Sequence, residues 1–299
     1  MIKSVTVINY LNEKLTLELM RPEKSGFVVK KIDGLGPVKA NINTMDVSTR
    51  DGSMYNSART SQRNIVIYLQ YLFQGSIENM RLKSYRYFPV KKPITLVIET
   101  DNRTLMIDGY VESNEPDIFS KDEGAQISIV CPNPYFYKAE KTAVVFYGTE
   151  PEFEFPFDLQ MGDEFEFSSI IRHERYNVYY SGDVDVGVTI VMRATGEVHN
   201  VGIFNLGTRE SIKIDTEKLQ RITSHPIVEG DEITICTVRG QKSVILTRNG
   251  DQRSIINCLS SGFDWFQLTM GDNLFTYTAD EGAEKLEFTI IHDTLYEGV

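Results

Sequence analysis

The sequence of 299 residues is poor in the features that mark membrane-spanning and secreted chains. No apolar run approaches the ~18 residues of a transmembrane helix, so we expect no membrane insertion. The first residues, MIKSVTV, alternate as a strand does and lack the apolar core of a signal peptide. We therefore expect the chain to be synthesised and folded in a cytoplasm.

Cysteine and histidine are also scarce. The cysteines are widely spaced and form no Cys-x-x-Cys pair, and isolated cysteines are usually small buried hydrophobes. The histidines form no His-x-x-x-His pair, so each is more simply a surface or packed residue than a metal ligand. These residues are Cys131, Cys236, Cys258, His173, His199, His225 and His292. We expect no metal ion and no cofactor.

Signatures of catalysis are missing as well. The sequence has no Gly-x-Ser-x-Gly, and Gly34 and Gly36 are followed by no Gly-Lys-Ser/Thr, which a phosphate loop requires. Asp183 and Asp185 would face the same way on a strand, so they could form a glycosidase pair or a calcium site. Such a pair is more often a turn acid beside a solvated strand acid. We expect that the protein is not an enzyme.

The sequence divides into two parts at residues 125–137, which we call the seam. Residues 125–137 begin as a strand that Pro132 and Pro134 end, because proline cannot donate to a β-ladder. Residues 1–140 hold 18 basic and 16 acidic side chains, a net charge of +2, whereas residues 141–299 hold 13 and 26, a net charge of −13. We predict two domains with these bounds. The first can pack against copies of itself, and the acidic second is a poor candidate for specific binding to nucleic-acid phosphates.

The first domain is predicted to be mostly β with one short helix. Residues 77–88 have apolar side chains at helical spacing, with Ser76 as the N-cap and Pro89 as the stop. Residues 38–62 form a long polar stretch, which is predicted as a loop that is functional, disordered or an interaction arm. The predicted strand at residues 63–73 is apolar on both faces, so its own domain or a neighbouring subunit must cover both.

These features supply the candidate residues of a subunit interface. They come from one apolar face of the predicted strand and from the basic flank of the predicted helix: Ile65, Ile67, Leu69, Tyr71, Arg81, Lys83 and Arg86. The basic flank is most simply solvated, and a contact with acidic groups of a partner is the alternative.

The second domain is predicted to be β almost throughout. The clearest hairpin pairs residues 243–247 with residues 253–258 around Asn249-Gly250, which is a typical two-residue turn. Many short strands separated by turns predict a β-sandwich. Trp265, the only tryptophan, could stack on a sugar ring, although packing in the core is the simpler interpretation.

Four motifs in a fixed order suggest a family. They are Ser84-Tyr85-Arg86-Tyr87-Phe88-Pro89, Cys131-Pro132-Asn133-Pro134-Tyr135-Phe136-Tyr137, Gly182-Asp183-Val184 and Ser261-Gly262-Phe263-Asp264-Trp265-Phe266. In this order and spacing the sequence resembles the distal tail proteins of long-tailed, siphovirus-type bacteriophages. The resemblance spans nearly the whole chain.

The resemblance implies an all-β protein with an N-terminal β-sandwich-like belt domain and a C-terminal galectin-like β-sandwich. It implies that the belt domain forms a hexameric ring at the tip of the virion's tail, after synthesis in the bacterial cytoplasm. Such a ring joins the tail tube protein to the tail-associated hub protein and in some phages anchors receptor-binding proteins, while phage DNA passes through the lumen. Two alternatives stay open: a carbohydrate-binding module of an adhesin that uses Trp265, and a cell-wall hydrolase with convergent carboxylates.

Overall fold

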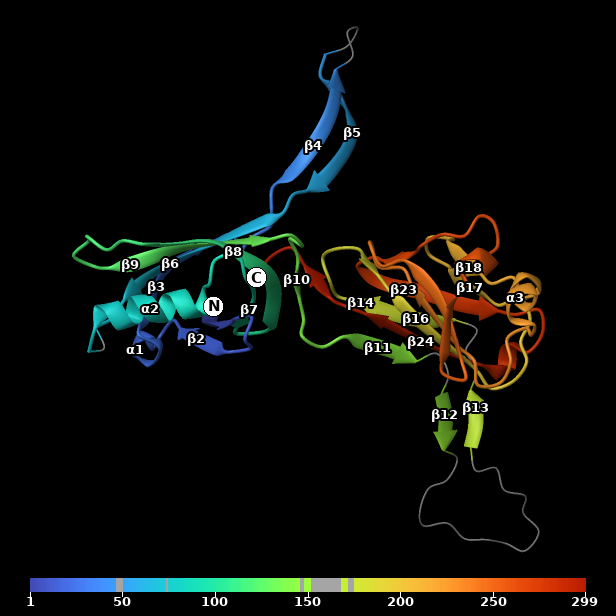
Figure 1. Cartoon of the computed structure of the whole chain (residues 1–299). Helices are drawn as coiled ribbons and strands as arrows, with labels where there is room; N and C mark the ends of the chain where they lie inside the picture. The colour runs from blue at the N-terminus through green and yellow to red at the C-terminus, as the bar shows by residue number, and fades with distance from the viewer. Residues whose placement is uncertain (47–50, 74, 146–147, 152–167, 172–174) are drawn as a thin grey trace, which may run out of the picture. The chain divides into compact units, whose positions relative to one another are not determined.

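The computed structural model describes residues 1–46, 51–73, 75–145, 148–151, 168–171 and 175–299 (Figure 1). These residues are mostly strands, so the predicted all-β class is confirmed. They form two compact units: unit 1 is Met1–Ala139 with Leu295–Val299, and unit 2 is Glu140–Thr294. The C-terminus departs from the predicted bounds, because residues 295–299 belong to unit 1. Among the described residues, no helix is long and apolar enough to cross a bilayer.

Unit 1 is built around one antiparallel sheet with the strand order β2-β1-β7-β8-β9-β6-β3. The short strand β10 pairs with both β8 and β25 beside this path. The strands are β1 (Ile2–Ile8), β2 (Lys14–Glu18), β3 (Phe27–Asp33), β4 (Ala40–Asp46), β5 (Ser53–Thr60), β6 (Arg63–Tyr71), β7 (Pro93–Thr100), β8 (Thr104–Pro116), β9 (Gly124–Cys131), β10 (Phe136–Tyr137) and β25 (Leu295–Tyr296), and the helices are α1 (Pro22–Ser25) and α2 (Ile77–Tyr87).

The long strand β8 serves two partners. Its first part pairs with β7 and its second part with β9, with a bulge between Val111 and Ser113. Gly109 lies just before this change of partner, where a Cβ atom would come 2.7 Å from the side chain of Ile129. A glycine is therefore required for β8 to pass so close to β9. Residues from all the main strands of this sheet pack in one buried core. The core includes Val5, Leu17, Phe27, Ile67, Leu96, Ile107, Ile129 and Phe136.

The predicted helix is confirmed as α2, with Ser76 at its N-cap and Phe88, the residue before Pro89, at its C-cap. Pro89 follows at the point where a proline is expected to stop a helix. The hydroxyl groups of Tyr71 and Ser84 lie 3.2 Å apart in a buried contact, which joins α2 to the end of β6. Among the described residues there are two further α-helices that the sequence analysis did not predict: α1 in unit 1 and α3 in unit 2.

The polar stretch at residues 38–62 is not a loop. It forms the antiparallel hairpin β4–β5, in which Ala40 pairs with Thr60 and Asp46 with Ser53. We call β4 and β5 the arm, because this hairpin extends away from the sheet of unit 1 (Figure 1). The arm makes a two-stranded sheet of its own, and every described residue of β4 is exposed.

Unit 2 is a β-sandwich of a six-stranded sheet, β11-β24-β16-β19-β20-β21, and a four-stranded sheet, β14-β23-β17-β18. The two sheets meet through aromatic pairs, since the ring centroids of Tyr277 and Phe288 are 4.4 Å apart. The predicted hairpin around Asn249-Gly250 is confirmed as β20–β21. The elements are β11 (Thr142–Val145), β12 (Gly148–Pro151), β13 (Ser168–Ile171), β14 (Tyr176–Tyr180), β15 (Val186–Gly187), β16 (Thr189–Ala194), β17 (Gly202–Asn205), β18 (Ser211–Lys213), α3 (Thr216–Thr223), β19 (Glu232–Cys236), β20 (Ser243–Arg248), β21 (Asp251–Ser254), β22 (Gln267–Leu268), β23 (Gly271–Thr278) and β24 (Leu286–His292).

Arg63 is fully buried at the base of the arm, with 1% of its surface exposed. Its guanidinium donates to the carbonyl oxygens of Pro134 and Gly36 at 2.6 Å, and to those of Gly34 and Glu297 at 2.5 Å. The guanidinium carbon also lies 4.5 Å from the ring centroid of Phe136. One side chain therefore joins the base of the arm, the end of the seam and the returning C-terminus.

Replacing Arg63 by leucine should destabilise unit 1 by about 3–5 kcal/mol, because buried carbonyl oxygens would lose their donor. Arg59→Leu removes an exposed arginine of the arm and is the matched control, expected to change stability by less than about 0.5 kcal/mol. The measurement is urea unfolding by circular dichroism, with fluorescence of Trp265 reporting unit 2 separately. Unfolding of Arg63→Leu at the wild-type urea concentration would contradict this role.

Candidate interaction surfaces

The four apolar interface candidates are not at the surface. Ile65, Ile67, Leu69 and Tyr71 are each at most 5% exposed and pack in the core of unit 1. The prediction that a neighbouring subunit covers them is wrong, because β6 lies between β3 and β9 and turns this face into its own unit. On the opposite face of β6, Asn64 is exposed and Val66, Tyr68 and Gln70 are half-buried.

Two of the three basic candidates on α2 have hydrogen-bond partners within unit 1. Lys83 Nζ donates to the carbonyl oxygen of Ser25 at 2.7 Å, and Arg86 Nε donates to Glu13 Oε2 at 2.9 Å. Arg81 is half-buried. Lys83 and Arg86 therefore fix α2 to its own unit, which is a different role from the contact with a partner that the alternative interpretation of the sequence offered.

Glu13 and Asn9 lock the turn between β1 and β2. Asn9 is buried, and its side-chain oxygen accepts hydrogen bonds from the backbone N–H groups of Leu11 and Glu13, both at 3.0 Å. Its amide nitrogen donates to Glu13 Oε2 at 3.0 Å. Hydrogen bonds from Arg86, and then from Asn9, lower the pKa of Glu13 from its usual 4.5 to about 2. This network holds Tyr10 at the tip of the turn.

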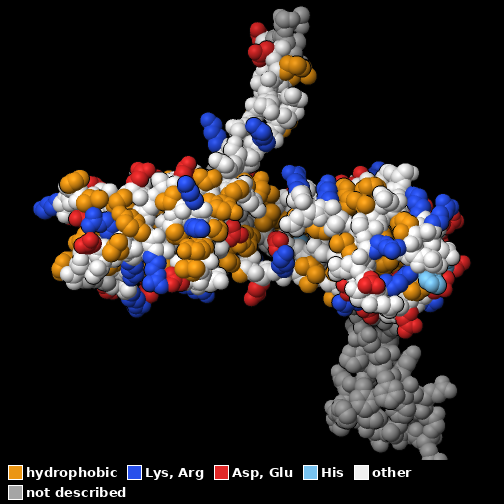
Figure 2. Space-filling model, in the orientation of Figure 1, with side chains coloured by type: hydrophobic (Ala, Val, Ile, Leu, Met, Phe, Trp, Pro, Cys, Tyr) orange, Lys and Arg blue, Asp and Glu red, His pale blue; other side chains and the backbone are white. Residues whose placement is uncertain are grey.

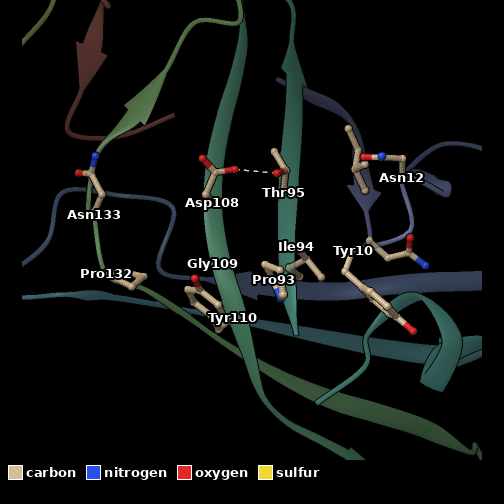
Figure 3. Close-up of a pocket in the computed structure, with 12 residues that line it drawn as sticks. Tyr10, Asn12, Pro93, Ile94, Thr95, Asp108, Gly109, Tyr110, Pro132 and Asn133 are labelled. Carbon is tan, nitrogen blue, oxygen red and sulfur yellow. Dashed lines mark hydrogen bonds between the residues drawn. The ribbon is translucent and has the colours of Figure 1, made fainter. Parts of the chain in front are cut away.

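Tyr10 forms one side of a groove in unit 1 (Figure 3). The groove has a volume of about 410 Å³, and we call it the Tyr10–Tyr110 groove. Pro93 lies between these two tyrosines in the view of Figure 3, and each tyrosine is about half exposed. Asp108 also lines the groove and lies next to Thr95 in Figure 3, where its carboxylate accepts a hydrogen bond from Thr95 Oγ1 at 2.6 Å. The full lining is Ile8, Asn9, Tyr10, Asn12, Pro93, Ile94, Thr95, Asp108, Gly109, Tyr110, Pro132 and Asn133.

The arm is the second exposed surface of unit 1, and its register gives it two different faces. Ile42 pairs with Ala58 and Thr44 with Tyr55, so these four side chains share one face. We call it the apolar face of the arm; Ile42 is 63% exposed and Tyr55 67%. In the view of Figure 2, hydrophobic side chains also cover much of the surface of unit 1 below the arm.

The opposite face of the arm, which we call the amide face, is polar near the base, whereas Met45 pairs with Met54 at the far end of the strands and both are more than half exposed. Asn43 pairs with Ser57, and the amide nitrogen of Asn43 donates to the Ser57 hydroxyl at 3.0 Å. Asn41 donates in the same way to Ser61 at 2.7 Å, and Arg59 pairs with Asn41. This amide face already satisfies part of its hydrogen-bonding capacity, whereas Ile42 and Tyr55 of the apolar face stay largely exposed among the described residues.

The remaining candidates of the sequence analysis lie in unit 2. Trp265 is half-buried at the surface, not in the core as the simpler interpretation predicted; the core residue is its neighbour Phe266. The Trp265 ring already has contacts, with the Phe263 ring 5.4 Å away and Lys242 Nζ 5.5 Å from its centroid. These contacts compete with a sugar for the ring.

The acidic and metal-ligating candidates are dispersed. Asp183 and Asp185 are both exposed and precede β15 in a loop, so they do not share the strand that the paired-carboxylate interpretation requires. Cys131 is buried, and burial raises the pKa of its thiol to about 11. Within the described ranges, no three His, Cys, Asp or Glu side chains lie close enough together to hold a metal ion. His173 lies outside those ranges.

Unit 2 contains a polar cavity of about 450 Å³ between β17, β18 and the start of α3. Several of its polar groups are used within the unit. Asp215 caps α3 by accepting from the backbone N–H of Lys218 at 3.1 Å, and Asn200 donates to Asp280 at 2.8 Å. These hydrogen bonds show that polar groups lining the cavity hold the local structure around α3 together.

No protein-family model and no curated protein matches the sequence. Among solved structures, the Dit protein (gp 19.1) of phage SPP1 aligns with 97% of this chain and 98% of its own, with a TM-score of 0.64 and 12% identity. The chain has the fold of SPP1 Dit. The resemblance to distal tail proteins is thus confirmed for the fold.

SPP1 Dit is described as a paradigm of the hub adsorption apparatus in phages that infect Gram-positive bacteria. The Dit fold here extends through both units, because the alignment covers nearly the whole of each chain. Chains of the phage p2 baseplate, in its activated conformation with Sr and with Ca, align over 96% and 97% of this chain at 11% identity and TM-scores of 0.43.

The Glu13 network gives a prediction for the turn that carries Tyr10. Because the folded-state pKa of Glu13 is lowered, its stabilisation is present above about pH 4.5 and is lost as the pH falls toward about 2. Glu13→Gln should therefore lower the urea midpoint of unit 1 at pH 7 and flatten its dependence on pH across this range. Glu115→Gln, which removes an exposed carboxylate of β8, is the control. Parallel curves for wild type and Glu13→Gln would contradict the assignment.

Proposed function

We propose that this chain is a structural ring protein of a phage tail tip. Six copies form a closed ring through unit 1, and the ring joins the tail tube protein to the tail-associated hub protein. Unit 2 carries the contacts with receptor-binding proteins, and phage DNA passes through the lumen without sequence-specific binding. The chain is not an enzyme in this proposal, and it acts in the virion after synthesis in the bacterial cytoplasm.

The observation that carries the proposal is the likeness to SPP1 Dit over nearly the whole of both chains. A fold alone does not fix a function, so the surfaces of this chain must supply the second argument. Unit 1 supplies it with an arm that is exposed along its length. A hairpin of two strands is marginally stable by itself in water, so a partner that covers it would stabilise it.

The distribution of charge favours unit 1 as the ring-forming part. The first 140 residues carry a net charge of +2, so identical copies approach each other without strong repulsion, whereas residues 141–299 carry −13. A ring also needs a head-to-tail contact, in which one patch of each subunit meets a different patch of the next. The arm and the Tyr10–Tyr110 groove are two such patches on one unit.

Replacing residues 40–60 by a short Gly-Ser linker should abolish the ring. Wild-type protein should show six times the chain mass of 34.1 kDa in multi-angle light scattering, and the variant should be a monomer. The matched control replaces the exposed loop 117–122 at the tip of the β8–β9 hairpin by the same linker and should stay hexameric. Trp265 fluorescence should show that unit 2 remains folded in both variants.

A wild-type protein that remains monomeric even at high concentration and with a tail tube protein present would count against the ring. A hexamer that survives loss of the arm would place the ring contact elsewhere.

A further inference from the structure

We infer that Leu295–Val299 is a clasp whose docking in unit 1 fixes the base of the arm, and that this docking depends on the folding of unit 2. The arm is then held in one direction only in a chain whose second unit has folded. The inference concerns a single chain and does not require the proposed ring. It depends on what the clasp contacts and on how the chain reaches it.

The clasp contacts the loop that leads into the first strand of the arm. Gly298 lies so close to this loop that a Cβ atom would come 3.3 Å from the carbonyl oxygen of Leu35 and 3.3 Å from Pro37 Cδ. The backbone N–H of Val299 donates to the same carbonyl oxygen of Leu35 at 3.1 Å. Because β4 begins shortly after Pro37, these contacts hold the segment from which the arm starts.

Arg63 joins the clasp to the other strand of the arm. Arg63 is the first residue of β6, which follows β5 of the arm after two residues. Its guanidinium donates to the carbonyl oxygens of Gly34 and Gly36 in the loop, and to that of Glu297 in the clasp. Withdrawal of the clasp would leave a buried N–H group without this acceptor, which favours opening of the site to water. Both ends of the arm therefore depend on contacts that the clasp completes.

The clasp is a short segment with little regular pairing. Its strand β25 pairs with β10 at two positions, where Tyr296 lies opposite Phe136 and Leu295 opposite Tyr137. Tyr296 is buried, and Arg103 lies 4.7 Å from the centroid of its aromatic ring. A segment this short loses conformational freedom when it docks, so it stays docked only if its attachment keeps it close to its site.

Unit 2 supplies that attachment, because its two ends are neighbours in the folded unit. Its strands β11 and β24 pair, so that Thr142 lies opposite His292. Beside this pair, Lys141 Nζ lies 3.5 Å from Asp293 Oδ2. The chain enters unit 2 just before this point and leaves it just after, and the clasp begins at the next residues. A folded unit 2 therefore delivers the clasp close to the strand β10 with which it pairs.

An unfolded unit 2 would not deliver the clasp in this way. Residues 140–294 would then be one flexible loop, and the probability that a loop closes falls with about the 3/2 power of its length. For a loop of this length, the effective concentration of the clasp at its site falls by about a hundredfold to a thousandfold. The few contacts of the clasp would then be insufficient, and the base of the arm would become mobile.

Variants of the full chain test the clasp and its dependence on unit 2 separately. Gly298→Val places a side chain against the loop and should undock the clasp. Glu297→Gln changes an exposed side chain but keeps the carbonyl acceptor, so it is the matched control. Phe288→Ala removes a buried side chain of β24 and should lower the urea concentration at which unit 2 unfolds. Every protein carries Met54→Cys, an exposed site on the arm, for a maleimide fluorophore, and protein without this substitution measures the background from native cysteines.

The measurement is time-resolved fluorescence anisotropy, at a dilution where light scattering gives the mass of one chain. The amplitude of fast arm motion should about double in Gly298→Val and should stay at the wild-type value in Glu297→Gln, since a released base permits motion on the nanosecond timescale. At a urea concentration where Trp265 fluorescence shows unit 2 unfolded in Phe288→Ala and folded in wild type, Phe288→Ala should reach the amplitude of Gly298→Val. Slow hydrogen exchange of the β6 and β9 amides shows that unit 1 remains folded.

Two results would overturn the inference. Equal amplitudes in Gly298→Val and wild type would show that the clasp does not fix the arm, and Gly298→Ala replaces the valine variant if β6 and β9 lose their protection. A low amplitude that persists after unit 2 has unfolded would show that docking does not depend on unit 2. Both results concern single chains, so they leave the proposed ring to its own test.

Discussion

The buried guanidinium of Arg63 is the constraint on which the architecture of unit 1 depends. A guanidinium has five N–H donors in a rigid plane, and here backbone carbonyl oxygens from three distant segments accept them. Those segments are the loop at the base of the arm, the end of the seam and the returning C-terminus. The base of the arm has little freedom in consequence: a Cβ atom at Gly34 would come 2.1 Å from the carbonyl oxygen of Asn64, and Gly34 has a φ of +86°.

This constraint explains why a slender hairpin can serve as an interaction element. An arm that swung freely would lose conformational freedom on binding and would bind weakly, whereas a fixed base reduces that cost. The groove is prepared in a similar way, because Asn9 and Glu13 hold the turn of Tyr10 and the register of β7 with β8 places Pro93 opposite Tyr110. The base of the arm and the turn of Tyr10 are therefore both held in place by contacts within unit 1.

The parts of this fold that local chemistry specifies could be predicted from the sequence, and those that long-range contacts specify could not. Ser76 and Pro89 bound α2, and Asn249-Gly250 marks β20–β21, because caps and turns act within a few residues. The arm was missed as a hairpin because its strands are polar enough to resemble a loop. Helix α3 had a readable signal, since Asp215 caps it, but the sequence analysis predicted β structure almost throughout this domain. The groove joins residues from distant segments, and Arg63 gave no local sign that it would be buried.

The composition of the arm balances assembly against solubility. A hairpin with long aliphatic residues at every position would dock more strongly, but its unpaired edges would also invite pairing with unrelated strands. Here the apolar face combines Ile42 and Tyr55 with the small or hydroxylated Thr44 and Ala58, and the other face is polar except for Met45 and Met54 at its end. Such a surface gains little from a random apolar contact. It gains most where a partner offers apolar area and a hydrogen-bond acceptor together.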